Sequence, residues 1–75
     1  MQTLHILVID VFDPKSELGM RAPIVRHEFP GITREDSEEH LQMHLEGDAI
    51  LRGCLRGERD CVAEMGWDTM EVPDA

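Results

Sequence analysis

Alternating apolar positions in the first half of the chain predict two strands. Residues 3–12 carry apolar side chains on both faces of an extended segment, which predicts a central strand covered on both sides. Residues 24–29 alternate apolar and polar positions, which predicts a half-buried strand that ends at Pro30-Gly31. Because the two segments are close in sequence, we expect them to pair in antiparallel fashion.

A helix is predicted to follow the second strand. Thr33 and Asp36 have the spacing of a capping box, and Ser37 is a second candidate for the N-cap. Acidic side chains occupy the first predicted turns and arginines lie near the far end, as the helix dipole favours. We therefore expect the helix to begin within one turn of Thr33.

Gly47 interrupts this helical pattern. A single helix running through Gly47 to Leu55 would place His44 and Asp48 on its apolar stripe. If the first helix instead ends at Gly47 and Asp48 caps a second one, the later apolar residues can turn inward independently. We therefore favour a kink or break at Gly47.

The last third of the chain predicts a third strand over residues 59–67, and residues 69–72 are a candidate for a short edge strand. The order β-β-α-β, with one optional further strand, predicts a single α+β domain over residues 1–75. In this fold, a small antiparallel sheet of three to four strands carries a kinked or broken helix on one face. The side chains expected to be largely buried are Ile6, Val8, Ile9, Val25, Phe29, Leu41, Leu45, Leu51 and Val62.

Composition and charge narrow the classes of partner. The chain is 41% hydrophobic and 31% charged, a globular composition, and its formal net charge is −9. A negative surface repels nucleic-acid phosphates and acidic membrane surfaces, whereas it attracts and steers a basic protein. We therefore expect a protein partner with a basic surface, with no direct binding of nucleic acid or membrane.

Targeting signals and cysteine content bear on the compartment. The sequence shows no basic leader segment and no apolar run of the ~20 residues that a membrane span needs, so we expect a cytoplasmic protein. Cys54 and Cys61 could form one disulfide, but in that compartment we expect them to stay reduced. Their spacing is also wider than that of a zinc knuckle.

Acidic residues cluster on the predicted helix and are the first candidates for a partner-binding surface. A negative helix face can steer a basic partner, and the competing interpretation is a solvated face that only complements the helix dipole. Trp67 is a further candidate because tryptophan is enriched in interfaces, although it is an equally good candidate for the core. The candidate partner-binding residues are Glu35, Asp36, Glu38, Glu39, Glu46 and Trp67.

Two histidines one helical turn apart, His40 and His44, form the sharpest candidate for a metal site. The competing interpretation leaves His40 exposed and pairs His44 with Asp48, and we favour it, so no metal is expected. If a metal were bound, the further ligands would come from His27, Asp48, Cys54 or Cys61.

No catalytic arrangement is visible in the sequence. It lacks a glycine-rich phosphate loop, and no local signature links a cysteine to a histidine and an orienting acid. A domain of this size also has little room for a pocket that encloses a substrate. We therefore expect a protein that is not an enzyme and carries no cofactor.

One segment resembles a known family. Phe29-Pro30-Gly31-Ile32-Thr33, followed by Asp36-Ser37-Glu38-Glu39, resembles the segment that enters the helix of HicB-type antitoxins, where an acidic capped helix follows a Pro-Gly turn. The chain lacks the family's extra strand before the helix and its appended DNA-binding module, so no HicB residue role is carried over. In size and charge the chain also resembles small acidic accessory proteins of phages and mobile elements, which often bind host proteins as anti-defence inhibitors.

The function expected from these features is that of a small acidic protein-binding module, of the phage inhibitor type, that docks on a basic, nucleic-acid-handling host protein. Two alternatives stay open. One is a small metal-binding protein that uses His40 and His44, and the other is a structural domain that forms a homodimer through an exposed sheet edge.

Overall fold

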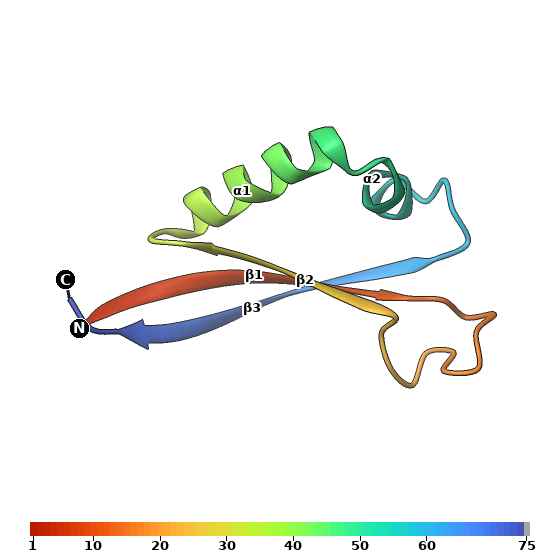
Figure 1. Ribbon diagram of the computed structural model, residues 1–75, viewed down its shortest axis with the longest axis horizontal. Helices are drawn as coiled ribbons and strands as arrows, with labels where there is room; N and C mark the ends of the chain where they lie inside the picture. The colour runs from red at the N-terminus through yellow and green to blue at the C-terminus, as the bar shows by residue number, and fades with distance from the viewer. Residues whose placement is uncertain (75) are drawn as a thin grey trace.

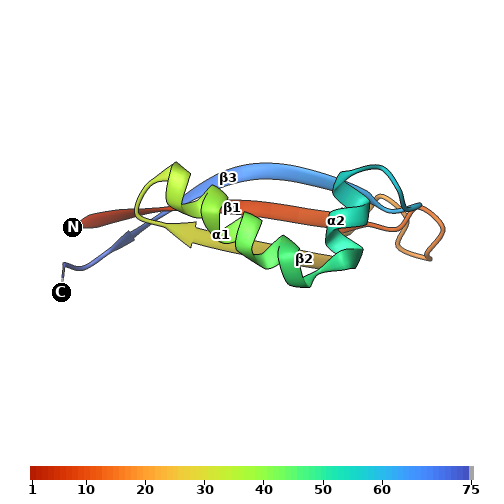
Figure 2. The same ribbon diagram turned by 90° about the horizontal axis from the view of Figure 1, so that it is seen from above.

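Three strands form one antiparallel sheet, and two helices lie on one of its faces (Figure 1, Figure 2). The elements are β1 (Gln2–Phe12), β2 (Val25–Gly31), α1 (Arg34–Gly47), α2 (Ala49–Leu55) and β3 (Val62–Val72). The strand order is β2-β1-β3, and both neighbouring pairs are antiparallel. In this computed structural model, which describes residues 1–74, the predicted α+β class is confirmed.

Strand β1 is the centre of the sheet, as predicted, but helices cover only one of its faces. Both helices lie on the side where Leu7, Ile9 and Val11 are buried (Figure 1). On the opposite face, Arg26 of β2 donates two hydrogen bonds to Asp10, of 2.6 and 3.0 Å. The prediction of cover on both faces is therefore wrong, because one face packs against helices while the other keeps an ion pair in contact with water.

Strand β3 is a single long strand. It pairs with β1 along its whole length, from Val72 opposite Gln2 to Val62 opposite Phe12. The predicted third strand is confirmed, but it begins at Val62 rather than at residue 59, and it continues through residues 69–72, which were predicted as a possible separate edge strand. The two segments are one strand because Asp68, the residue between them, stays in the ladder opposite Ile6.

The helical segment breaks at Gly47, as predicted. Helix α1 ends there, and Asp48 is both its C-cap and the N-cap of α2. At the other end of α1, the Asp36 N–H donates to Thr33 Oγ1 at 3.1 Å and the Thr33 N–H donates to Asp36 Oδ2 at 3.3 Å. This capping box identifies Thr33 as the N-cap, rather than Ser37.

Ser37 fastens α1 to the centre of the sheet. Its side chain is buried, and its hydroxyl donates a hydrogen bond of 2.7 Å to the main-chain oxygen of His5 on β1. The end of β2 comes equally close, because a Cβ atom on Gly31 would lie 2.5 Å from the Ser37 nitrogen. Glycine is therefore required where the chain turns from β2 into α1.

Cys54 and Cys61 form a disulfide that links the end of α2 to the start of β3. The prediction that they stay reduced is therefore wrong. Their Cα atoms lie 5.6 Å apart because the turn after α2 folds back toward the sheet, with Gly57 at a positive φ of 72°. Among residues 1–74, no helix is long and apolar enough to cross a membrane.

The core lies between the helices and the covered face of the sheet. Val25 and Val62 are 42% and 39% exposed, so the prediction of their burial is wrong. Val25 begins β2 at the rim of the core, and Val62, opposite Phe12, points to the face away from the helices. Val8 and Leu45 are only half-buried. The prediction is confirmed for Ile6, Ile9, Phe29, Leu41 and Leu51. Leu7, Val11 and Cys54 complete the cluster beneath the helices, whereas Ile6 and Phe12 are buried on the opposite face of β1.

Truncating the core tests this packing. Leu51→Ala should lower the free energy of unfolding by about 2–5 kcal/mol, because Leu51 is buried in the main cluster. Leu45→Ala should cost less, since Leu45 is half-buried at the edge of that cluster. Ile50→Ala is the matched control, because Ile50 is an exposed residue of the same helix as Leu51. Urea denaturation measures all three, and a larger loss in Leu45→Ala than in Leu51→Ala would contradict the packing.

Candidate functional site

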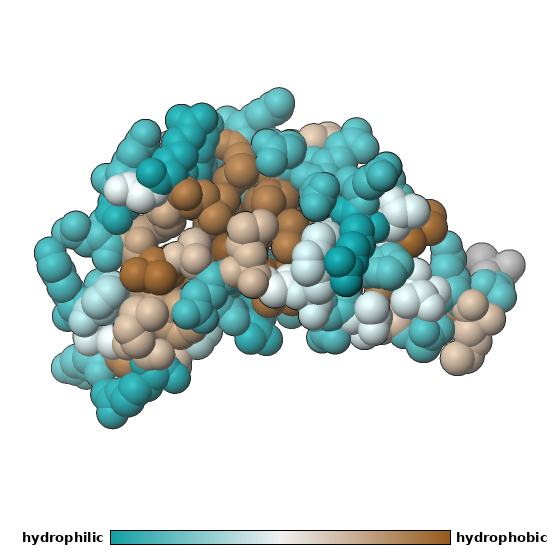
Figure 3. Space-filling model, turned by 180° about the vertical axis from the view of Figure 1, so that it is seen from behind, coloured by the Kyte–Doolittle hydropathy of each residue, from teal (hydrophilic) through white to brown (hydrophobic). Residues whose placement is uncertain are grey.

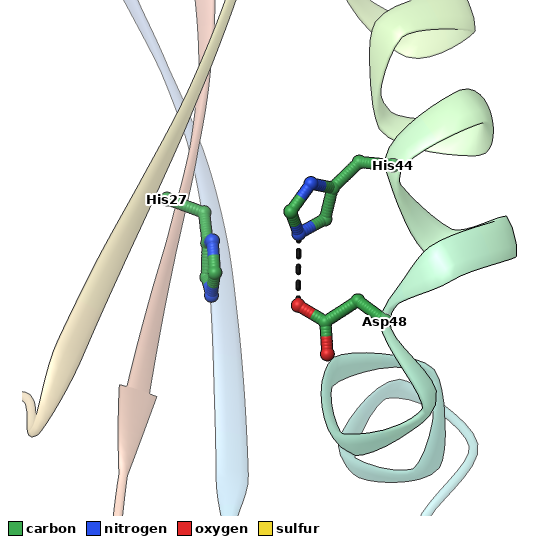
Figure 4. Close-up of side chains that lie close together, drawn as sticks. All are labelled: His27, His44 and Asp48. Atoms are coloured by element: carbon green, nitrogen blue, oxygen red, sulfur yellow. Dashed lines mark hydrogen bonds and ion pairs between the residues drawn. The ribbon is translucent and has the colours of Figure 1, made fainter.

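Three side chains that can bind a metal meet between the sheet and the helices. They are His27 of β2, His44 of α1 and Asp48 at the helix junction (Figure 4), and we call them the His27–His44–Asp48 cluster. One ring nitrogen of each histidine and one Asp48 oxygen all lie within 4.8 Å of one another. The shortest contact joins His44 Nε2 to Asp48 Oδ2 at 2.8 Å.

Local sequence explains why these residues meet. His44 and Asp48 are four residues apart and lie on the same side of the helix, toward β2. His27 pairs with Ile9 across the sheet, and Ile9 points into the core beneath the helices, so His27 points to the same side. The break at Gly47 then sets Asp48 at the start of α2, where its backbone leaves the axis of α1.

Aromatic contacts hold the two imidazole rings. The rings of His27 and His44 lie 5.2 Å apart between centroids. Phe29, on the same strand face as His27, meets the His44 ring edge to face at 5.3 Å and stacks with His27 at 6.1 Å. Since Phe29 is buried, these contacts restrict the rotation of both histidines.

The hydrogen bonds of Asp48 favour its ionised form. The Leu51 N–H, which donates to Asp48 Oδ1 at 2.9 Å, does most to hold the pKa of the Asp48 carboxyl below its usual value. The neighbouring His44 and His27 lower that pKa further, against the opposing effect of burial. Two imidazoles beside an ionised carboxylate form the donor set that divalent transition metals prefer.

A small hollow of about 200 Å³ adjoins the cluster. His27 and Asp48 contribute to its wall, and the rest is apolar, formed by side chains of β1, α2, the disulfide and the segment entering β2. The lining residues are Val11, Ile24, Val25, His27, Asp48, Ile50, Leu51, Cys54 and Cys61.

His40 does not join the cluster. It is exposed, as the favoured interpretation required, and the His44–Asp48 contact of that interpretation is present. From the sequence, His27 was predicted only as a possible further ligand to a metal at His40 and His44. The signal for it was the alternation of residues 24–29, which sets His27 on the same face as Phe29.

The predicted partner-binding residues are all exposed, five of them on α1 and Trp67 on β3. The Asp36 carboxylate accepts a hydrogen bond from the Thr33 N–H in the capping box of α1. Trp67 lies on β3, where the Arg34 guanidinium sits 4.8 Å from the centroid of its ring. Helical spacing sets Glu38 one turn beyond Arg34 on the β3 side of α1. The remaining acidic residues, all exposed, are Glu35, Glu39 and Glu46.

A second feature is the uncovered surface of β3. Helix α1 packs mainly on β2 and β1, and α2 reaches only the start of β3 (Figure 2). On the helix-facing side of β3, Met65 is 56% exposed and Trp67 is 37% exposed. Apolar side chains gather on this side of the molecule, between the helices and the sheet (Figure 3).

The outer backbone edge of β3 has no partner strand among residues 1–74. The Thr69 N–H donates to its neighbour's carboxylate, Asp68 Oδ1, at 2.8 Å, and so points away from β1. Because alternate residues of a strand direct their N–H and C=O groups to opposite edges, those of Met65 and Trp67 also point outward. We call this backbone edge, with the exposed side chains of Met65 and Trp67, the β3 edge.

Comparisons with protein-family models, with curated proteins and with solved structures found no match to this chain. The resemblance of residues 29–39 to HicB-type antitoxins stays a prediction. Function is therefore inferred from the geometry of the two features described above.

The capping role of Asp48 gives a test of the helix junction. Asp48→Ala should destabilise the protein by about 1 kcal/mol, because the Leu51 N–H loses its acceptor. Asp48→Asn keeps a good cap and should cost clearly less. Urea denaturation distinguishes the two, and equal losses would show that the charge of Asp48, rather than its cap, stabilises the junction.

Proposed function

We propose that this protein is a protein-binding domain that receives an extended, basic segment of its partner as a fourth strand along the β3 edge. The observation that carries the proposal is the combination, on one strand, of an unpaired backbone edge with an exposed methionine and tryptophan. Such addition of a strand draws affinity from main-chain hydrogen bonds and specificity from the side-chain surface beside them.

The backbone of β3 supports this role through its length and its uninterrupted pairing with β1. It runs for 11 residues and is held by β1 over that whole length. An incoming strand would therefore meet an edge that is already extended, so little conformational entropy is lost in ordering the receiving side. Long unprotected edges of this kind readily pair with another chain.

The side chains beside that edge supply the apolar part of the contact. Met65 and Trp67 lie on the helix-facing side of β3 and are 56% and 37% exposed. Arg34 braces the Trp67 ring from the start of α1 through a cation–π contact. Tryptophan and methionine are both enriched at the centres of protein interfaces.

Charge favours a basic partner over a second copy of this chain. Strand β3 carries Glu64, Asp68 and Glu71, and it has no lysine or arginine. An antiparallel pair of two β3 strands centred on Gly66 would set Glu64 of one copy opposite Asp68 of the other, which is unfavourable. Lysine or arginine at those positions of a partner strand would instead be attracted.

A peptide titration tests the proposal. The probe is a peptide of about nine residues, the length of a typical strand, that alternates lysine and valine. Added to ¹⁵N-labelled protein, it should shift the amide signals of β3 most, with an affinity that falls as salt rises. The same peptide with glutamate in place of lysine should not bind.

Two variants at one position separate the backbone from the side chain. Met65→Ala removes the side chain alone, whereas Met65→Pro also removes the outward N–H and leaves the hydrogen bonds to β1 in place. Affinity should fall in both, and further in Met65→Pro. Glu39→Gln is the control, because Glu39 is exposed on α1 and distant in sequence from β3, and it should bind nearly as well as the parent.

Shifts confined to the acidic residues of α1, with β3 unaffected, would overturn the proposed site. Concentration-dependent shifts of β3 without any peptide would show that a second copy, rather than a basic partner, occupies the edge.

A further inference from the structure

We propose that the His27–His44–Asp48 cluster is a binding site for a divalent first-row transition metal ion such as Zn²⁺. The site is separate from the β3 edge and does not depend on the proposed function. Within residues 1–74 it is the one group of three metal-ligating side chains whose donor atoms lie this close together.

The donor atoms are near the arrangement that one ion needs. With Zn–N bonds of about 2.0–2.1 Å, ligand atoms of a tetrahedral zinc lie roughly 3.4 Å apart. His44 Nε2 and Asp48 Oδ2 are already 2.8 Å apart, and no pair in the cluster is more than 4.8 Å apart. A small rotation of the His27 ring, together with a slight parting of His44 from Asp48, brings all three into range.

Metal binding would replace the hydrogen between His44 and Asp48 with the ion. The contact between His44 Nε2 and Asp48 Oδ2 is a hydrogen bond, so one hydrogen lies between the two atoms. An ion that bonds to both atoms takes the place of that hydrogen, which either moves to His44 Nδ1 or leaves as a proton. The two ligands from the helical segment thus need no backbone movement to face the ion.

Neighbouring groups that would not themselves bind the ion hold the three ligand side chains in position. The Leu51 N–H holds the other oxygen of Asp48 at 2.9 Å, and Phe29 lies against both histidine rings. Such outer contacts fix ligand direction and strengthen metal binding in known sites. The three ligands also come from β2, α1 and the helix junction, so their spacing is set by tertiary packing rather than by one flexible segment.

Three protein ligands leave one position of a tetrahedral ion open. An apolar hollow of about 200 Å³, lined in part by His27 and Asp48, adjoins the cluster. A site with three protein ligands and an open position differs from a closed structural zinc site, which has four. The ion would thus be able to hold a water molecule or a small anionic ligand.

Titration of the full chain, purified with a chelator and then freed of it, tests the site. Isothermal titration with Zn²⁺ should show one ion per chain, and Co²⁺ should produce the visible absorption of a bound, low-symmetry ion. Thermal melting should shift upward with added Zn²⁺, because the ion binds the folded chain. Absence of any heat, absorption and shift would overturn the proposal.

Variants locate the ion. His27→Gln and Asp48→Asn should each weaken Zn²⁺ binding by about tenfold or more, and Asp48→Asn retains a helix cap, so its fold is expected to survive. His40→Gln is the matched control on the same helix, since His40 is exposed and outside the cluster, and it should bind like the parent. Equal weakening in His40→Gln, with His27→Gln unaffected, would assign the ion to the helix surface and overturn the proposed site.

Discussion

The position of α1 across β2 and β1 decides what the rest of the molecule exposes. The helix contacts the sheet at both ends: the buried Ser37 hydroxyl bonds to β1 near its start, and the His44 ring near its end lies against His27 and Phe29 of β2. With only two helices for three strands, the helix-facing side of β3 stays largely exposed beyond its first residues, although Arg34 of α1 lies against Trp67. The exposed β3 edge and the partly exposed His27–His44–Asp48 cluster beside α1 are thus two consequences of the same packing.

Asp48 shows how one residue can serve both structure and chemistry. Its Oδ1 caps α2, while its Oδ2 contacts His44. The cap depends on the break at Gly47, and the break also turns Leu51 and Cys54 into the core. A metal at the cluster would therefore bind to a side chain that is already held in place by the helix junction, and it would tie α1, α2 and β2 together.

The sequence predicted the elements whose signals are local. The capping box at Thr33, the break at Gly47 and the central place of β1 all follow from spacing within a few residues. Properties that depend on tertiary packing were harder to predict. Val62 is exposed because it points away from the helices, and Val25 is exposed at the rim of the core, and neither property follows from the local alternation of residue types.

The contacts of the candidate sites also divide into those that follow from local sequence spacing and those that depend on tertiary packing. The contact of His44 with Asp48 follows from helical spacing, but the approach of His27 depends on which strand lies beneath α1. The disulfide was missed for a related reason, because an assumed reducing compartment took precedence over a turn that brings Cys54 and Cys61 together. Trp67 was found from its residue type, and its place beside an open strand edge became visible only once β3 was seen to be one strand.

Amide hydrogen exchange of the free protein, followed by NMR at low concentration, tests the open edge most directly. Because alternate N–H groups of β3 face β1, the amides of Gly66 and Met70 should exchange slowly. Those of Met65 and Trp67 should exchange much faster, in an alternating pattern along the strand. Uniform slow exchange at all four residues would contradict the claim that the β3 edge is free to receive a partner.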